Sequence, residues 1–111
     1  MSLSTHVLDA VRGVPAARMP LRLEAAASTG WRLVAVSRTD DDGRARLEAS
    51  AAFVPGTYRL KFDTATYFTD LGIKEFFYPE VVVCFAVSDP AARYHVPLLL
   101  SPFAYSTYRG T

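Results

Sequence analysis

The strongest constraint on the fold of this chain is a repeated alternation of apolar and polar residues with a period of two. It is clearest over 58–62, where three large apolar side chains share one face and two cations share the other. The segments 21–25 and 31–38 repeat the pattern. Alternation of this kind is typical of strands that bury one face in a core. We therefore expect a protein built mainly from short strands.

Further apolar runs extend the set of expected strands. An opening strand covers 3–9, and two more cover 94–100 and 103–108. The run 81–87 is almost wholly apolar, so we expect a central strand covered on both faces, with the Cys84 thiol buried in it. The stretch 14–20 holds two prolines and should be an exposed connection or an irregular strand start.

Turn residues separate these runs at short intervals. Asp40-Asp41-Asp42-Gly43 and Pro55-Gly56 are two examples. Closely spaced turns favour a sandwich or barrel over alternating α/β units. We expect an all-β sandwich of eight strands in a single domain over residues 1–111, since a chain of this length has room for one core.

One segment has the pattern of a helix. Asp63 can cap a short helix that runs to about Leu71, and Gly72 can adopt the left-handed conformation that ends it. Tyr67 and Phe68, together with Leu71, would form the buried stripe of this helix.

The charge balance and the apolar runs exclude several classes of function. Twelve Lys and Arg against eleven Asp and Glu give a net charge of +1, with no excess positive charge for a phosphate backbone. No apolar run approaches the roughly 20 residues that span a bilayer. The first residues lack the pattern of a secretory signal. We therefore expect a soluble, cytoplasmic protein that binds neither nucleic acid nor membrane.

The two histidines, His6 and His95, both fall within expected strands. Histidine is the side chain whose ordinary pKa permits proton transfer near neutral pH, so the pair is a candidate for acid–base catalysis. The alternative is a structural role for each ring within its strand. Two histidines without a further ligand motif make a poor zinc site, and we expect no metal and no cofactor.

Arg44 and the C-terminal segment are further candidates. Arg44 follows an acidic turn, where it either forms loose surface ion pairs or presents its guanidinium to a carbonyl or anionic oxygen. The segment Tyr108-Arg109-Gly110-Thr111 places an aromatic ring, a cation, a hydroxyl and the terminal carboxylate within four residues. This segment either forms an edge strand that pairs with another subunit or lines a functional site, and the two roles are compatible.

Four segments together resemble the transthyretin-like (prealbumin-like) family, and specifically its enzymatic branch, the 5-hydroxyisourate hydrolases. They are Leu3-Ser4-Thr5-His6-Val7-Leu8-Asp9, Asp42-Gly43-Arg44, Phe77-Tyr78-Pro79-Glu80-Val81, and the stretch from Tyr94-His95-Val96-Pro97 to Tyr108-Arg109-Gly110-Thr111. The resemblance implies a β-sandwich of two four-stranded sheets with one short helix. It also implies a homotetramer, a dimer of dimers, with active sites at the dimer–dimer interface.

The resemblance also implies a reaction and the residues that perform it. Water adds to the lactam carbonyl of 5-hydroxyisourate and opens the ring, giving 2-oxo-4-hydroxy-4-carboxy-5-ureidoimidazoline in urate breakdown. One histidine acts as general base while the other orients the water or relays the proton, and their order stays open. The catalytic residues would be His6, Arg44 and His95, and the substrate-binding residues Arg44, Tyr108, Arg109 and Thr111.

Two positions depart from the family pattern, and one rival function shares the fold. Thr111 stands where the family commonly ends in serine, and Arg93 stands where many members have histidine. Arg93 falls on the face of His95, where it lowers the pKa of that ring or points into solvent. The rival is a transthyretin-type carrier of a small hydrophobic ligand, but carriers lack the paired histidines and the Tyr-Arg-Gly tail. A purely structural or adhesive sandwich would leave the same features unexplained.

Overall fold

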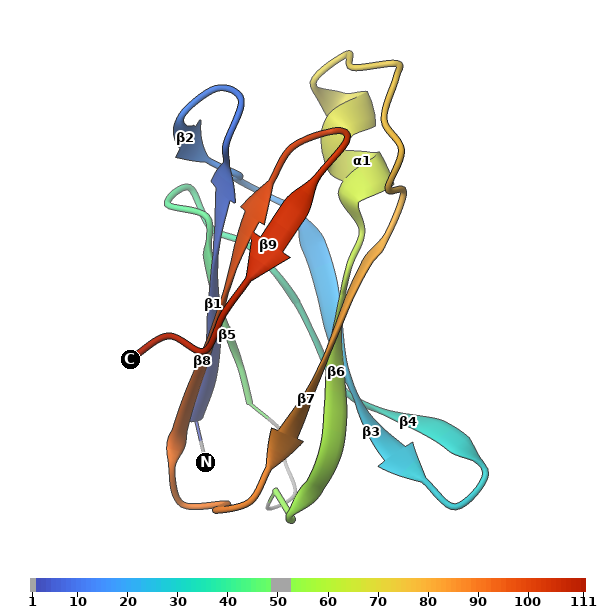
Figure 1. Cartoon of the computed structure of the whole chain (residues 1–111), viewed down its shortest axis with the longest axis vertical. Coiled ribbons are helices and arrows are strands. Elements are labelled where there is room, and N and C mark those ends of the chain that lie inside the picture. Colours follow the sequence, from blue (N-terminus) through green and yellow to red (C-terminus); the bar gives the residue numbers. More distant parts are fainter. Residues whose placement is uncertain (1, 49–52) are drawn as a thin grey trace.

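The computed structural model describes residues 2–48 and 53–111. Its elements are β1 (Ser2–Asp9), β2 (Val14–Pro15), β3 (Pro20–Ala27), β4 (Gly30–Arg38), β5 (Arg44–Leu47), β6 (Gly56–Phe62), α1 (Thr64–Asp70), β7 (Val81–Val87), β8 (Arg93–Leu100) and β9 (Tyr105–Thr107). Two sheets face each other, and the helix lies at one end of the sandwich (Figure 1). The expected all-β sandwich with one short helix is confirmed.

The two sheets differ in how their strands are joined. One is antiparallel, in the order β4-β3-β6-β7. The other has the order β2-β1-β8-β9, and β1 runs parallel to β8. Both β5 and β2 pair with the remaining edge of β1, β5 along its first half and β2 at its end. The second sheet therefore has five strands rather than four, because the proline-rich stretch 14–20 contributes the two-residue strand β2.

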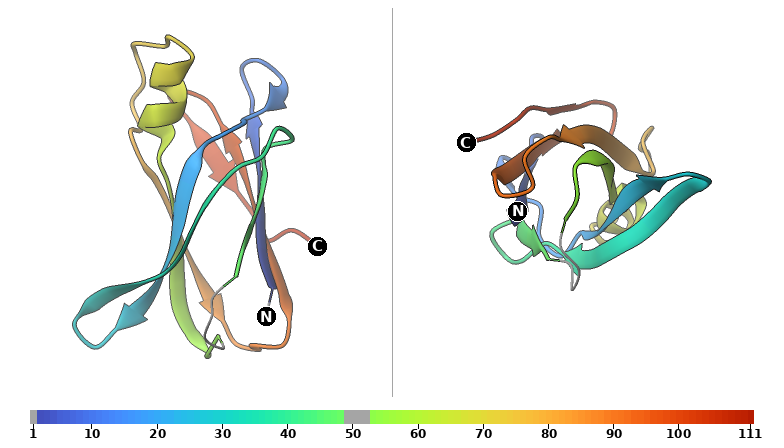
Figure 2. Two further views of the ribbon diagram at one scale, coloured as in Figure 1. Left: turned by 180° about the vertical axis from the view of Figure 1, so that it is seen from behind. Right: turned by 90° about the horizontal axis from the view of Figure 1, so that it is seen from below.

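The core fills the space between the sheets with alternate residues of each strand. In β6 the inward residues are Tyr58, Leu60 and Phe62, as the alternation predicts. In β8 all of the even-numbered residues from Tyr94 to Leu100 are buried. Each large apolar side chain buried in this way contributes roughly 1.5–3 kcal/mol. Seen end on, the sheets enclose this core and the C-terminal segment runs along the outside of β8 (Figure 2).

The strand predicted over 81–87 is confirmed as β7, but its predicted central position and two-sided burial are wrong. β7 is the edge strand of its sheet, and only alternate residues such as Val81 and Val83 face the core. Val82 is 40% exposed, and Cys84 is an exposed thiol rather than a buried one. A wholly apolar run does not reveal whether its second face is covered by the same chain. Among residues 2–48 and 53–111, nothing covers the free edge of β7 and its outer face is largely exposed, which makes β7 a surface suited to pairing with another chain.

The helix begins as the sequence predicts but buries less than expected. The Asp63 carboxylate accepts a hydrogen bond from the backbone N–H of Thr66 at 3.1 Å, and Gly72 has a φ of +76°. Tyr67 and Phe68 are buried. Leu71 is 41% exposed, so the expected buried stripe is wrong at this residue. Leu71 is the C-cap, and its side chain lies beyond the last turn that packs on the sandwich.

A buried hydrogen bond ties the helix to the end of β1. The Tyr67 hydroxyl donates to Asp9 Oδ2 at 2.8 Å, and Asp9 Oδ1 accepts from the backbone N–H of Val11 and Arg12 at 3.1 and 3.0 Å. Burial, and then the hydrogen bond and charge of Asp9, raise the pKa of Tyr67 to about 12, so the hydroxyl keeps its proton. The Asp9 charge is thereby satisfied without leaving the protein interior.

Replacing this hydroxyl tests the strength of the link. Tyr67→Phe should lower the free energy of unfolding by about 1–3 kcal/mol, because the buried Asp9 carboxylate loses a donor. Tyr105→Phe is the matched control, since the Tyr105 ring is 39% exposed and its hydroxyl makes no hydrogen bond within the described residues. The measurement is equilibrium unfolding in denaturant. Equal losses in the two variants would contradict the proposed role of the bond.

Candidate functional site

The parallel pairing of β1 with β8 places both histidines on one outer face. Ser4 lies opposite His95 in the ladder, and His6 lies opposite Pro97. Because Leu3 and the alternate residues that follow it face the core, Ser4 and His6 point outward. His95 is half-buried on the adjacent strand and points to the same side. The two rings are diagonal neighbours within one chain.

Arg44 joins this face through a tight turn. It opens β5 directly opposite His6. The Asp40 carboxylate accepts hydrogen bonds from the backbone N–H of Asp42 and of Arg44, both at 2.9 Å, so it holds the turn and makes no ion pair with the guanidinium. The structure therefore places Arg44 beside the histidines rather than in a surface pair with the acids that precede it.

Gly43 is the residue that lets this turn approach β1. Its φ is +75°, and its carbonyl accepts a hydrogen bond from the backbone N–H of Val7 at 2.8 Å. A Cβ at this position would lie 2.5 Å from the Val7 carbonyl oxygen. Only glycine satisfies both the left-handed conformation and the close approach. The position of Arg44 thus depends on the residue before it.

The C-terminal segment folds back over β8 and ends against His95. β9 pairs with β8, and the same register continues to a bridge between His95 and Gly110. The Gly110 N–H donates to the His95 carbonyl at 2.8 Å. A Cβ at Gly110 would lie 2.4 Å from Cδ2 of the His95 ring, so a larger residue would displace the ring. Backbone pairing with β8 holds the tail, although most of its side chains are exposed, and it brings Thr111 to the same face as the histidine.

Arg44, His95 and Thr111 border a pocket of about 510 Å³ on the outer face of the sheet. Most of its lining is polar and comes from the first residues of β1, from β5, from the start of β8 and from the C-terminal residue. The lining includes Ser2, Ser4, Arg44, Arg46, Arg93, His95 and Thr111. His6 stands beside this pocket as the ladder neighbour of Arg44.

The surroundings of His95 favour its neutral form. Burial lowers the pKa of His95, and the nearby charges of Arg44 and His6 lower it further, while a hydrogen bond at Ser4 acts in the opposite direction. His95 Nδ1 lies 2.8 Å from Ser4 Oγ, which fixes the orientation of the ring. An oriented neutral imidazole next to a guanidinium can accept a proton while the guanidinium binds a developing negative charge.

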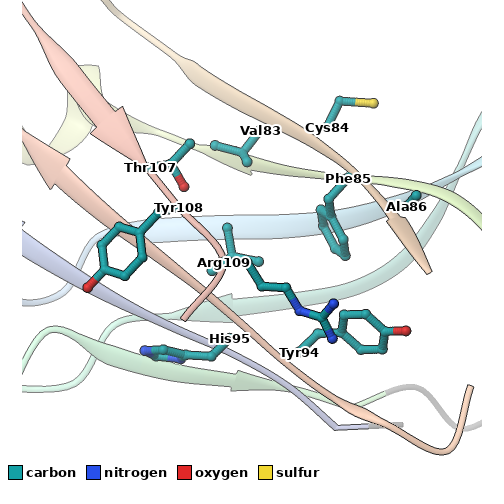
Figure 3. A pocket seen from close by; sticks show the side chains of 10 residues that line it. Val83, Cys84, Phe85, Ala86, Tyr94, His95, Thr107, Tyr108 and Arg109 are labelled. Carbon is teal, nitrogen blue, oxygen red and sulfur yellow. The ribbon is translucent and has the colours of Figure 1, made fainter. Parts of the chain in front are cut away.

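Tyr108 and Arg109 lie on a second cavity rather than on this pocket. That cavity, of about 320 Å³, opens between β7 and the strand β8 with its C-terminal extension. The Arg109 guanidinium carbon lies 5.0 Å from the centre of the Tyr94 ring. Figure 3 shows Arg109 directed toward Tyr94 and Tyr108 directed away from it. Tyr94 and His95 of β8 border both cavities, while Tyr108 and Arg109 line one of them and Thr111 lines the other.

The structure therefore groups four of the expected residues and adds two that the sequence patterns missed. His6, Arg44, His95 and Thr111 come together, while Tyr108 and Arg109 face the neighbouring cavity. The additions are Ser4 and Arg46. Ser4 precedes His6 by two positions, so the period-two pattern already placed it on the histidine face. Arg46 follows Arg44 by two positions and so shares its strand face, but the sequence patterns did not predict a strand over 44–47.

The described residues hold neither a metal-binding cluster nor a membrane-spanning helix. Within 2–48 and 53–111, no three His, Cys, Asp or Glu side chains are grouped so as to bind a metal ion. No helix in the same residues is long and apolar enough to cross a membrane.

Comparison with known proteins identifies the family. The model of the HIUase/Transthyretin family matches residues 3–110. The chain belongs to the HIUase/Transthyretin family. Within that family, 5-hydroxyisourate hydrolase from Mus musculus is 45% identical to this chain over 98% of it and 94% of the mouse protein. The resemblance inferred from the four sequence segments is thereby confirmed.

Solved structures of the HIUase/Transthyretin family share this fold. The structure of Klebsiella pneumoniae 5-hydroxyisourate hydrolase has a TM-score of 0.86 and 30% identity, and each chain covers the other completely. Sea bream transthyretin in complex with thyroxine has a TM-score of 0.88 and 34% identity, with 98% of this chain and 94% of that chain covered. Since both branches of the family share the sandwich, the fold alone does not distinguish a hydrolase from a carrier.

The electrostatic coupling between Arg44 and His95 can be measured directly. Arg44→Gln removes a positive neighbour of the imidazolium, so the pKa of His95 should rise toward its ordinary value. The measurement is an NMR titration of the two histidine rings. Arg32→Gln is the control, because Arg32 lies in β4 of the opposite sheet, and it should leave the pKa of His95 unchanged. An unaltered His95 titration in Arg44→Gln would contradict the coupling.

Proposed function

We propose that this chain is a 5-hydroxyisourate hydrolase that acts in urate breakdown. The observation that carries the proposal is the oriented imidazole of His95 next to Arg44 in a polar pocket, where burial and Arg44 lower the pKa of the ring. The hydrolase from mouse, at 45% identity, supports the same function. The reaction needs a base for water and a cation for an oxyanion, and the pocket provides both.

The chemistry is the addition of water across a cyclic amide bond. The water oxygen bonds to the lactam carbonyl carbon while a base takes one water proton, and the carbonyl oxygen becomes an oxyanion. The carbon–nitrogen bond then breaks, and the leaving nitrogen receives a proton. The new carboxylic acid loses its own proton to solvent, so the product carries a carboxylate that the substrate lacks.

His95 is the proposed general base. In the tautomer that this role requires, Nδ1 donates its proton to Ser4 Oγ, and Nε2 is free to take the proton of the water. The lowered pKa of His95 keeps this ring neutral at neutral pH. His6, the diagonal neighbour on β1, orients the water or relays the proton onward.

The remaining site residues bind the substrate and the developing charge. Arg44, next to His6 in the ladder, stabilises the oxyanion. Thr111 lines the pocket and can hydrogen-bond the ring through its hydroxyl. Tyr108 and Arg109 adjoin the site through the second cavity and contact substrate in a site completed between subunits.

The proposed assembly is a homotetramer, a dimer of dimers. The open apolar face of β7, with Val82 40% exposed, supports pairing of this edge with a second copy. Phe77, Phe103 and Tyr108 are 60–70% exposed, which is typical of surfaces that a partner covers. Covering this side of the sandwich would bring further residues to the cavity that holds Arg109.

A carrier function fits the pocket poorly. A hydrophobic ligand is bound by apolar lining with a few polar groups. Here three arginines and a histidine line the pocket on the outer face. Burying that many cations under an apolar ligand would cost desolvation free energy without compensation.

The assay that tests this proposal follows the ultraviolet decay of the intermediate formed by urate oxidase from urate. Adding the protein should accelerate the decay above the spontaneous rate. His95→Ala and His6→Ala should each reduce kcat/KM by about 10²–10⁴-fold, because each removes a group that handles the proton. Arg32→Gln, on the opposite sheet, should retain the wild-type rate. Full hydrolysis by both folded histidine variants would exclude the assignment, and an unaccelerated decay with the wild-type protein would exclude the function.

A further inference from the structure

The pocket has a basic end that the proposed reaction does not use. Arg46 lies opposite Ser4 in the β1–β5 ladder, and Arg93 lies opposite Ser2 in the β1–β8 ladder. Both side chains line the pocket together with His95. Arg93 precedes His95 by two positions, so the two share a face of β8.

Short and long side chains together shape this end of the pocket. Ser2 and Ser4 form its floor along β1. The backbones of β5 and β8 lie on either side of β1, about 10 Å apart, or two inter-strand spacings. Arg46 rises from one side of this floor and Arg93 from the other, so the two guanidinium groups can approach one ligand from both flanks.

Within the described parts of the chain, no carboxylate forms an ion pair with these arginines. The ion pairs there link Arg12, Arg18, Arg22, Arg59 and Lys61 to acids elsewhere in the structure. Arg44, Arg46 and Arg93 have no such partner in residues 2–48 and 53–111, and all three are exposed. Three like charges around one pocket repel one another, and a bound anion relieves that repulsion.

We propose that Arg46 and Arg93 bind the carboxylate that ring opening creates. The inference rests on the proposed function, since the substrate lacks this group and the product has it. The carboxylate forms at the carbon attacked by water, and that carbon must lie within reach of His95, which borders the same end of the pocket. A guanidinium matches a carboxylate with two parallel hydrogen bonds, and both arginines can donate in this way.

A pair of stable ligands separates the contribution of the carboxylate from that of the ring. Orotate is a planar heterocyclic carboxylate, and uracil is the same ring without the carboxylate. Calorimetry should show orotate binding to the wild-type protein at least about tenfold more tightly than uracil. In the double variant Arg46→Gln/Arg93→Gln, orotate affinity should fall by about 10–100-fold while uracil affinity stays the same.

Controls distinguish the loss of a carboxylate-binding site from misfolding of the variant and from loss of hydrolysis. Arg32→Gln removes one exposed positive charge from the opposite sheet and should leave orotate affinity unchanged. Thermal unfolding should give the same Tm for wild type and double variant, because both arginines are exposed. Equal binding of orotate and uracil, or unchanged orotate affinity in the double variant, would overturn the carboxylate site. This calorimetry needs no turnover, so it can fail while hydrolysis persists. If the urate oxidase assay showed no hydrolysis, the anion bound by Arg46 and Arg93 would not be the product of this reaction.

Discussion

The parallel pairing of β1 with β8 is the constraint on which the site depends. It joins Ser4 to His95 across 91 positions of sequence and sets His6 beside them. The register is held from the other face of the sheet, where Leu3, Val7 and the even-numbered residues of β8 fill the core. A slip of one residue would turn these apolar side chains outward and the histidines inward, so the free energy of the core also fixes the geometry of the site.

The same pairing determines the electrostatics of the pocket. Because β5 pairs with the free edge of β1, its two arginines stand across β1 from His95. In the preceding turn, Asp40 accepts hydrogen bonds from backbone N–H groups and Asp41 pairs with Arg18. The face is therefore positive, and in the described residues no carboxylate forms an ion pair with its arginines. This environment keeps an imidazole neutral and favours anions, the two properties that an oxyanion mechanism with an acidic product requires.

Local sequence patterns predicted the buried face of strands such as β3 and β6, but not which strands are neighbours. The alternation over 31–38 was wrong as a sign of burial, because β4 is an edge strand on which Trp31 and Leu33 are 37% and 56% exposed. Alternation correctly placed His6 with Ser4, and it correctly assigned the inward residues of β6. Alternation gave no guide for β7, because a strand with apolar residues on both faces has the same sequence pattern whether its second face is covered or exposed. The four residues of β5 were too short to stand out. The direction of Arg109 toward Tyr94 depends on how the tail crosses β8, which is a tertiary property without local signal.

The pH dependence of kcat/KM for 5-hydroxyisourate is the most direct test that His95 is the base of this site. A base must be neutral to accept a proton, so activity should fall as the pH drops through the pKa of His95 in the free enzyme. Because burial and Arg44 lower that pKa, the fall should occur at a more acidic pH than for an ordinary histidine. The midpoint should coincide with the His95 midpoint from NMR and move to higher pH in Arg44→Gln. A rate that stays constant through the His95 titration would contradict the account.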